Sequence, residues 1–270
     1  MQLKQFISSV FRKAGVAAIA DKTRFALQYI SNYSGNRSFA KSQPEFVFPP
    51  AYFIYETYTL NYKDYFEDGK QTAGEIIDLL KPYLKIGRSD FKVLDWGCGP
   101  ARVVRHIPGL FGNNHAVFGC DYNDSYIKWC TKAIPEVSFI RNELVPPVDL
   151  PSNSMDAIYG LSILTHLSEK NHRFWIDELF RLLKPGGVLL ITTQGNKFKD
   201  KLLPAELKLF ESGGLLVRDF EKEGHRMYSA FQPETYMKQL LGNFKLLRFI
   251  AGGSAESVHA LQDTWIVQKS

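Results

Sequence analysis

The sequence predicts an α/β protein with a doubly wound, mostly parallel sheet covered by helices on both faces. From residue 91 onward, short apolar runs alternate with helix-length segments, and a glycine-containing turn follows the first run. Strands are expected at 91–96, 116–121, 137–141, 155–162 and 187–194, and helices at about 101–108, 123–133 and 168–183. A later helix is expected near 233–241, and later strands near 244–250 and 263–268.

The composition predicts a soluble globular protein. Hydrophobic residues make up 45% of the 270 residues and charged residues 23%, which is too apolar for a disordered chain. No apolar run approaches the roughly 20 residues that a membrane-spanning helix needs. The three cysteines, Cys98, Cys120 and Cys130, lack the spacing of a disulfide framework or a zinc site. We therefore expect a reducing, cytoplasmic compartment and no metal.

The N-terminal 48 residues are expected to form a basic arm, followed by a domain over 49–270. The formal net charge is +5, and residues 1–48 hold seven basic and two acidic side chains, so the rest is balanced. The balanced domain does not favour nucleic acid as a partner. Apolar residues recur at helical spacing at the start: Leu3, Phe6, Ile7, Val10, Phe11 and Ala14.

This apolar stripe allows three interpretations. The helix packs on its own domain, residues 1–30 contact an anionic membrane or a partner, or the segment is a cleaved transit peptide. A loop from Ser34 to Pro50 is expected to end the arm.

Two further segments are candidates to cover a substrate site. Residues 51–66 are rich in tyrosine and phenylalanine, and residues 197–232 form a long insertion, expected to be irregular, before the sixth strand. The alternative for 51–66 is a small aromatic core of its own. After Gly69, a helical pattern has Ile76, Ile77 and Leu80 on its apolar side.

The turn after the first strand is the most informative segment, Asp95-Trp96-Gly97-Cys98-Gly99-Pro100-Ala101-Arg102. Open α/β sheets bind ligands at such a turn, and glycine allows a ligand to approach the main chain. A dinucleotide site requires a third glycine where Arg102 stands, and the Asp95 carboxylate would repel a pyrophosphate. The amino group of S-adenosylmethionine would instead be attracted to it.

The segment resembles the first motif of the class I S-adenosylmethionine-dependent methyltransferases. The resemblance covers residues 90–195, including "FIRNELVPPVDLPSNSMDAIYGLSILTHLSE" and "WIDELFRLLKPGGVLLITTQG", and departs at Ala101, where many members have glycine. It is similar to a bacterial small-molecule or saccharide subgroup with a Pro-Pro pair, Thr-His-Leu and a late Gln-Asp pair, here Gln262-Asp263. The resemblance implies a Rossmann-like, seven-stranded sheet with an antiparallel last strand.

The resemblance also implies the residues that bind S-adenosylmethionine. The methionyl end would lie against Asp95, Gly97, Gly99, Leu161 and Ser162, with Cys98 contributing its backbone; Asp121 would bind the ribose, Tyr122 would pack on the adenine, and Asn142 would contact the adenine amino group. An acid at the end of the second strand suits the ribose of NAD equally, so Asp121 does not separate the two cofactors.

The expected function is methyl transfer to an oxygen or nitrogen atom of a small metabolite or saccharide. His166, just past the fourth strand, and His225, in the insertion, are the candidate bases, because histidine titrates near neutral pH. Each also has a plain structural alternative. The alternative functions are a non-catalytic S-adenosylmethionine-binding regulator or partner subunit and, third, an NAD-dependent oxidoreductase.

Overall fold

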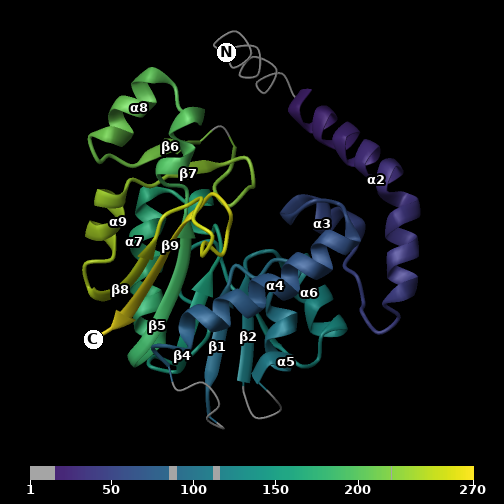
Figure 1. Cartoon of the computed structure of the whole chain (residues 1–270), viewed down its shortest axis with the longest axis horizontal. Helices are drawn as coiled ribbons and strands as arrows, with labels where there is room; N and C mark the ends of the chain where they lie inside the picture. Colours follow the sequence, from purple (N-terminus) through teal and green to yellow (C-terminus); the bar gives the residue numbers. More distant parts are fainter. Residues whose placement is uncertain (1–15, 85–89, 112–115, 220) are drawn as a thin grey trace. The chain divides into compact units, whose positions relative to one another are not determined.

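The computed structural model describes residues 16–84, 90–111, 116–219 and 221–270 (Figure 1). The chain divides into two compact units, Met1–Glu67 and Asp68–Ser270, and the boundary lies within helix α4 (Tyr62–Leu80). The sequence predicts a boundary after residue 48. It lies later because the aromatic segment 51–66 packs with the preceding helix.

The first unit is built on one long helix, α2 (Val16–Ser42), and the shorter α3 (Ala51–Thr57). The loop expected from Ser34 is therefore wrong over its first part, since α2 continues through Gly35. Tertiary contacts outweigh the low helix propensity of this stretch. The Asn36 side chain accepts a hydrogen bond from the Tyr62 main-chain N–H at 2.9 Å, and the Phe39 ring contacts Phe66.

The aromatic segment 51–66 forms a small core of its own, as the alternative to a cover of the substrate site predicted. Its buried members are Ile54, Tyr55, Leu60 and Tyr65. The Tyr55 hydroxyl donates to the Asp21 carboxylate at 2.7 Å and so fixes α3 to α2. Aromatic side chains supply large buried area at low entropic cost, which suits a core made from few residues.

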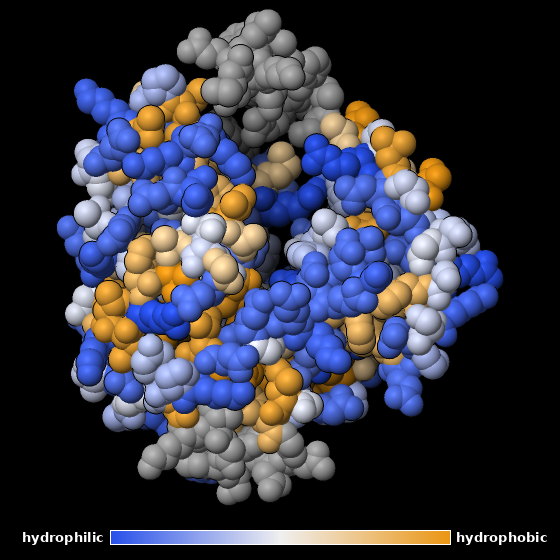
Figure 2. Space-filling model, in the orientation of Figure 1, coloured by the Kyte–Doolittle hydropathy of each residue, from blue (hydrophilic) through white to orange (hydrophobic). Residues whose placement is uncertain are grey.

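The remaining surface of α2 carries exposed apolar side chains (Figure 2). Ile19, Leu27 and Ile30 are 67%, 64% and 73% exposed. The apolar stripe of residues 1–14 lies outside the described residues, so membrane or partner contact by residues 1–30 stays a prediction. Among the described helices, none has the length and apolar character to cross a membrane.

The second unit is organised around one seven-stranded sheet. Its strands are β1 (Lys92–Trp96), β2 (Ala116–Asp121), β3 (Ser138–Arg141), β4 (Met155–Gly160), β5 (Leu183–Thr193), β8 (Phe244–Ile250) and β9 (Asp263–Lys269). The spatial order is β3-β2-β1-β4-β5-β9-β8, and β9 runs antiparallel to both neighbours. The predicted fold class is confirmed.

Helices cover both faces of the sheet because alternate strand residues point to opposite sides (Figure 1). One core includes Val93 and residues of α4, α5 (Ile107–Phe111) and α6 (Asp124–Ala133). The other includes Trp96 and residues of α7 (Glu169–Leu182) and α9 (Glu234–Leu240). The helix expected at 101–108 is instead a turn followed by η1 (Val104–His106) and α5.

The insertion is folded and not irregular, contrary to expectation. It contains η3 (Asn196–Lys201), α8 (Pro204–Glu211), β6 (Leu216–Arg218) and β7 (Ser229–Phe231), and the two strands form an antiparallel pair. Phe198, Phe210 and Phe231 belong to its separate core. Local pairing and burial thus stabilise a segment in which sequence periodicity is weak.

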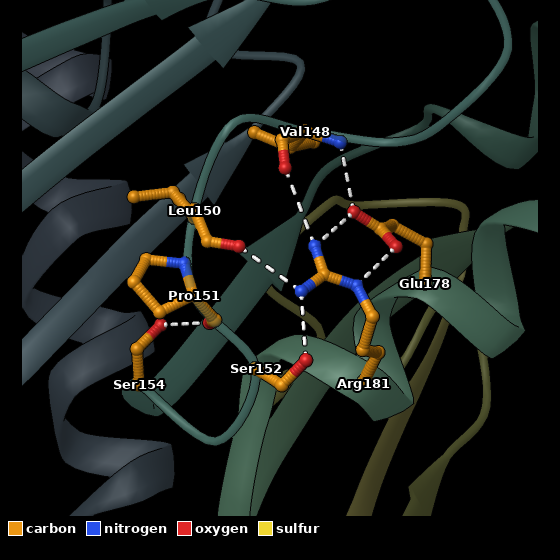
Figure 3. A network of polar contacts seen from close by, with 7 residues as sticks. All are labelled: Val148, Leu150, Pro151, Ser152, Ser154, Glu178 and Arg181. Atoms are coloured by element: carbon orange, nitrogen blue, oxygen red, sulfur yellow. Dashed lines mark hydrogen bonds and ion pairs between the residues drawn. The ribbon is translucent and has the colours of Figure 1, made fainter.

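Helix α7 fixes the connection between β3 and β4 through two charged side chains (Figure 3). Glu178 accepts a hydrogen bond from the Val148 N–H at 2.8 Å, and Arg181 pairs with Glu178 and donates to the carbonyls of Val148 and Leu150. Burial alone would raise the pKa of Glu178, but the Arg181 guanidinium and the Val148 N–H together lower it below its usual value.

Replacing Arg181 by Met should lower the free energy of unfolding at pH 7 by about 1.5–3 kcal/mol, because the Glu178 carboxylate loses its charged partner. A lowered pKa contributes stability above the unfolded pKa and loses it as pH falls through the folded pKa, so the difference from wild type should shrink on acidification. Urea unfolding at pH 7 and pH 4 measures both effects. The exposed Arg173–Glu169 pair on the same helix provides the control, since Arg173→Met should change stability by less than about 0.5 kcal/mol. Equal losses in the two variants would contradict this account.

Candidate functional site

The carboxyl ends of the first strands are joined directly to one another by main-chain hydrogen bonds. The N–H groups of Gly97 and Cys98 donate to the Cys120 carbonyl at 2.8 and 3.0 Å, and the Asn142 N–H donates to the Asp121 carbonyl at 3.1 Å. Asp95 lies near the end of β1, Asp121 ends β2, and Asn142 directly follows β3, and these three strands are neighbours in the sheet. The structure therefore brings the three predicted polar residues to one edge of the sheet.

The turn after β1 requires an unusual backbone. Gly97 has φ +75°, and a Cβ there would lie 2.1 Å from Cδ1 of Ile163, so only glycine fits. Ala101 has φ +63°, also in the left-handed region that favours glycine, the residue that the resemblance led us to expect there. Alanine in this conformation costs about 1 kcal/mol relative to glycine.

Asp121 is held by main-chain donors. Its Oδ2 accepts a hydrogen bond from the Gly99 N–H at 2.9 Å, and its Oδ1 accepts one from the Asn123 N–H at 2.8 Å. Each carboxylate oxygen keeps a further lone pair, which suits two vicinal hydroxyl groups. Burial raises the pKa of Asp121 to about 6, although the main-chain N–H groups oppose that shift.

Asp95 is a buried acid with a strongly altered titration. Burial raises its pKa to about 7; the Tyr159 hydroxyl and the charge of Arg102 lower it, and Asp121 raises it. The Tyr159 hydroxyl lies toward the carboxylate, but no hydrogen bond of standard geometry joins them. A ligand cation beside Asp95 would restore its charged form, because an opposite charge favours ionisation.

Asn142 has an unpaired acceptor at the expected position. Its Nδ2 donates to the Glu143 carbonyl at 2.6 Å, and since a carbonyl only accepts, Oδ1 must be the atom on the other side. This Oδ1 is buried and has no partner among the described residues. Buried acceptors are almost always paired, so an amino group such as that of adenine fits here.

The remaining predicted cofactor contacts are placed as follows. The Tyr122 ring is 42% exposed beside Asp121, and its hydroxyl donates to the Gly224 carbonyl at 2.9 Å. Leu161 packs against the core of the α4 face. The Cys98 N–H donates to the Cys120 carbonyl, and burial raises the pKa of the Cys98 thiol. This residue therefore stabilises the turn through its main chain and a buried, neutral side chain.

Ser162 is part of a polar network that the sequence did not reveal. It has φ +65°, and its N–H donates to Thr192 Oγ1 at 2.8 Å. Gln262 donates through Nε2 to Ser162 Oγ and accepts through Oε1 from Thr192 Oγ1, both at 2.7 Å. The sequence motif Gln262-Asp263 suggested no role for either residue. Its glutamine fixes the turn after β4.

The two candidate histidines lie close together. His166, in η2 (Leu164–His166), has Nδ1 2.9 Å from the Tyr228 carbonyl. A carbonyl cannot donate, so Nδ1 carries the proton and the neutral ring presents Nε2 as an acceptor. Burial lowers the pKa of His166 and is the largest effect; the hydrogen bond to the Tyr228 carbonyl opposes it, and the nearby His225 adds to it. His225 itself is exposed, and its Nδ1 accepts from the Met227 N–H at 3.2 Å.

The described residues include no group of three histidine, cysteine, aspartate or glutamate side chains arranged to hold a metal ion. The polar groups at the sheet edge instead fit a ligand with an ammonium group, vicinal hydroxyls and an aromatic amino group. Asp95, Asp121 and Asn142, in that order along the edge, match these three features of S-adenosylmethionine.

Comparison with known proteins agrees with this geometry. Residues 93–187 match the family model of a methyltransferase domain. The chain is 34% identical over 114 residues to a tRNA (carboxymethyluridine(34)-5-O)-methyltransferase from Arabidopsis thaliana, covering 41% of this chain and 26% of the relative. It is 32% identical over 107 residues to the sterol 24-C-methyltransferase of Aspergillus fumigatus, covering 37% and 27%. The chain thus spans about a quarter of the length of these relatives.

A solved structure extends the fold comparison beyond the matched segment. An S-adenosylmethionine-dependent methyltransferase from Methanosarcina mazei aligns with 71% of this chain and 96% of its own, at 21% identity and a TM-score of 0.55. The likeness shows a shared fold. The family match shows a methyltransferase domain over residues 93–187, and the polar groups at the sheet edge fit S-adenosylmethionine as its cofactor.

Proposed function

We propose that the protein transfers the methyl group of S-adenosylmethionine to an oxygen or nitrogen atom of a small polar molecule, of the saccharide or small-metabolite class. The observation that carries this proposal is the neutral His166 ring, whose Nδ1 is bound to the Tyr228 carbonyl and whose Nε2 is an acceptor at the sheet edge. A hydroxyl or ammonium acceptor must lose a proton during transfer, and a positioned base can take it.

Bound S-adenosylmethionine supplies a methyl group on a positively charged sulfur, so transfer is an in-line substitution. The chain's own residues have three tasks. Asp95, Asp121 and Asn142 fix the cofactor, the Ser162 turn shapes the place beside it, and His166 removes the proton of the acceptor. Alignment of two bound reactants accounts for up to roughly 7–11 kcal/mol of barrier reduction in well-oriented systems.

The charge of the second unit supports a small acceptor over nucleic acid. Residues 68–270 contain 25 basic and 23 acidic side chains, so they lack the positive excess on which phosphate-backbone binding depends. The polar ring of His166, just past β4, supports a polar acceptor over a sterol. The tRNA and sterol acceptors are those of the named relatives.

The other two functions make different demands on the site. A regulator that only binds the cofactor needs Asp95 and Asp121 but no base at His166. An oxidoreductase needs room for a pyrophosphate at the first turn, where Arg102 replaces the third glycine and the Asp95 carboxylate is buried. S-adenosylhomocysteine should therefore raise the melting temperature and NAD should not; at 100 times Kd, binding stabilises by about 2.7 kcal/mol.

Turnover tests the function itself. The protein should form S-adenosylhomocysteine, detected by mass spectrometry, with members of a panel of sugars, hydroxylated metabolites and amines. His166→Gln should lower kcat by about 10²–10⁴-fold and leave cofactor affinity unchanged, because the base acts only in the chemical step. Full activity of this variant would remove His166 from the mechanism. No turnover with any acceptor would favour the regulator.

Asp121→Ala should weaken S-adenosylhomocysteine binding by about 10–100-fold, since charge-assisted hydrogen bonds to the ribose are worth about 1.5–3 kcal/mol. Isothermal titration calorimetry measures this change. Asp124, a half-exposed acid that pairs with Lys128 four residues further along, provides the matched control, and Asp124→Ala should bind normally. Equal affinity of the two variants would refute the ribose assignment.

The affinity should also depend on pH. In the free protein the pKa of Asp95 is about 7, and the ligand ammonium favours the ionised carboxylate. Binding of S-adenosylhomocysteine should therefore strengthen from pH 5.5 to pH 8 and release protons to the buffer. Asp95→Asn should bind weakly and lose the slope near pH 7, keeping only the slope near pH 6 that Asp121 contributes. At pH 8 it should melt higher than the wild type, because a raised carboxyl pKa costs folded stability as pH rises through it. A steep profile in Asp95→Asn would assign the effect elsewhere.

A further inference from the structure

The segment between β6 and β7 is attached to the start of α7. Glu223 Oε1 accepts hydrogen bonds from the Ser168 N–H at 2.5 Å and from Asn171 Nδ2 at 2.7 Å. Ser168 is the N-cap of α7, and its own Oγ accepts from the Asn171 N–H. A carboxylate at a helix N-terminus is favoured by the helix dipole as well as by these donors. Glu223 is thus bound close to His166, because His166 precedes Ser168 by only two residues.

The next residue contacts both halves of the site. The Gly224 N–H donates to the His166 carbonyl, and the Gly224 carbonyl accepts from the Tyr122 hydroxyl, each at 2.9 Å. Gly224 has φ +84°, and a Cβ there would lie 2.8 Å from Leu144 Cδ1 and 3.2 Å from Tyr122 Cζ. Its main chain therefore lies tightly between the strand ends that bind the adenosine and the turn that carries His166.

The segment reaches the histidine a second time at Tyr228. The Tyr228 carbonyl accepts from Nδ1 of His166, and the Tyr228 N–H donates to the His225 carbonyl, which closes the turn. His166 is consequently held at its main-chain carbonyl by Gly224 and at its ring by Tyr228. The Glu223 carboxylate is bonded to Ser168 and Asn171 and not to the His166 ring, so its effect on His166 acts through this segment.

We propose that residues 223–228 form a clamp in which Glu223 positions His166 and Tyr122 links that position to the adenosine half of the site. The proposal rests on the proposed function, because it assigns a role to Glu223 through the base His166. Tyr122 follows Asp121 directly, so a nucleoside bound there meets the same side chain that holds Gly224. Cofactor binding and the placement of the base are then coupled through one hydroxyl group.

Glu223→Ala is the first test. Loss of both contacts to α7 should free the segment and lower kcat by about tenfold or more, with a smaller rise in the KM for S-adenosylmethionine, because Gly224 also holds Tyr122. The acid limb of the kcat profile should move to higher pH, because His166 becomes more hydrated and its pKa returns toward the ordinary value. Glu223→Gln keeps an acceptor oxygen and should restore most of the activity. Glu221→Ala, a nearby acid without this contact to α7, should behave as wild type.

Two readouts need no acceptor. Histidine NMR titration should show the His166 pKa rising in Glu223→Ala, with His106 of η1, outside the clamp, as internal reference. Trypsin should cleave Glu223→Ala after the exposed Lys222 about tenfold faster than Glu223→Gln, which also lacks the charge beside the cleaved bond but keeps an acceptor oxygen for α7. S-adenosylhomocysteine should slow this cleavage in the wild type but not in Tyr122→Phe, which retains the ring and lacks the hydroxyl.

An unchanged His166 titration together with unchanged cleavage in Glu223→Ala would overturn the clamp. Equal protection by S-adenosylhomocysteine in wild type and Tyr122→Phe would overturn the link through Tyr122. A wild-type protein that transfers no methyl group would instead contradict the proposed function, and the titration and the proteolysis would still decide the clamp.

Discussion

The site depends on the pairing of the Asp121 carboxylate with main-chain N–H groups. The Gly99 N–H comes from the turn after β1 and the Asn123 N–H from the turn after β2, so one side chain joins the two turns that form the floor of the site. An unpaired carboxylate at this depth would be costly to bury. With two donors it is fixed in orientation, and lone pairs on both oxygens remain for a ligand.

The neighbouring polar groups follow from the same arrangement of strands. Parallel order places the ends of β1, β2, β3 and β4 at one edge, so an acid, a second acid and an amide are presented in sequence to a single elongated ligand. Without a ligand, each of these three side chains lacks part of its partners. Burial raises the pKa of Asp95 and Asp121, and Asn142 Oδ1 has no hydrogen-bond partner among the described residues. A site with such deficits is preorganised for charge and hydrogen bonds that the ligand supplies.

The sequence predicted the parts of the molecule where local signals and tertiary structure agree. Alternating apolar runs located the strands, and the strand order brings Asp95, from the glycine turn, to the same edge as Asp121 and Asn142, which the resemblance implied. Local sequence patterns gave wrong predictions where contacts between distant residues determine the structure. Gly35 suggested a loop, but Asn36 and Phe39 hold a helix there through residues more than twenty positions away. The hairpin of the insertion and the Thr192–Gln262–Ser162 network depend on pairs distant in sequence, which no periodicity encodes.

The most direct test of the account is a crystal structure of the complex with S-adenosylhomocysteine. The account requires the ligand ammonium beside the Asp95 carboxylate, both ribose hydroxyls on Asp121, and the adenine amino group within hydrogen-bonding distance of Asn142 Oδ1. A ligand bound away from this edge, or one that leaves Asn142 Oδ1 unpaired and Asp95 without a cationic neighbour, would contradict it.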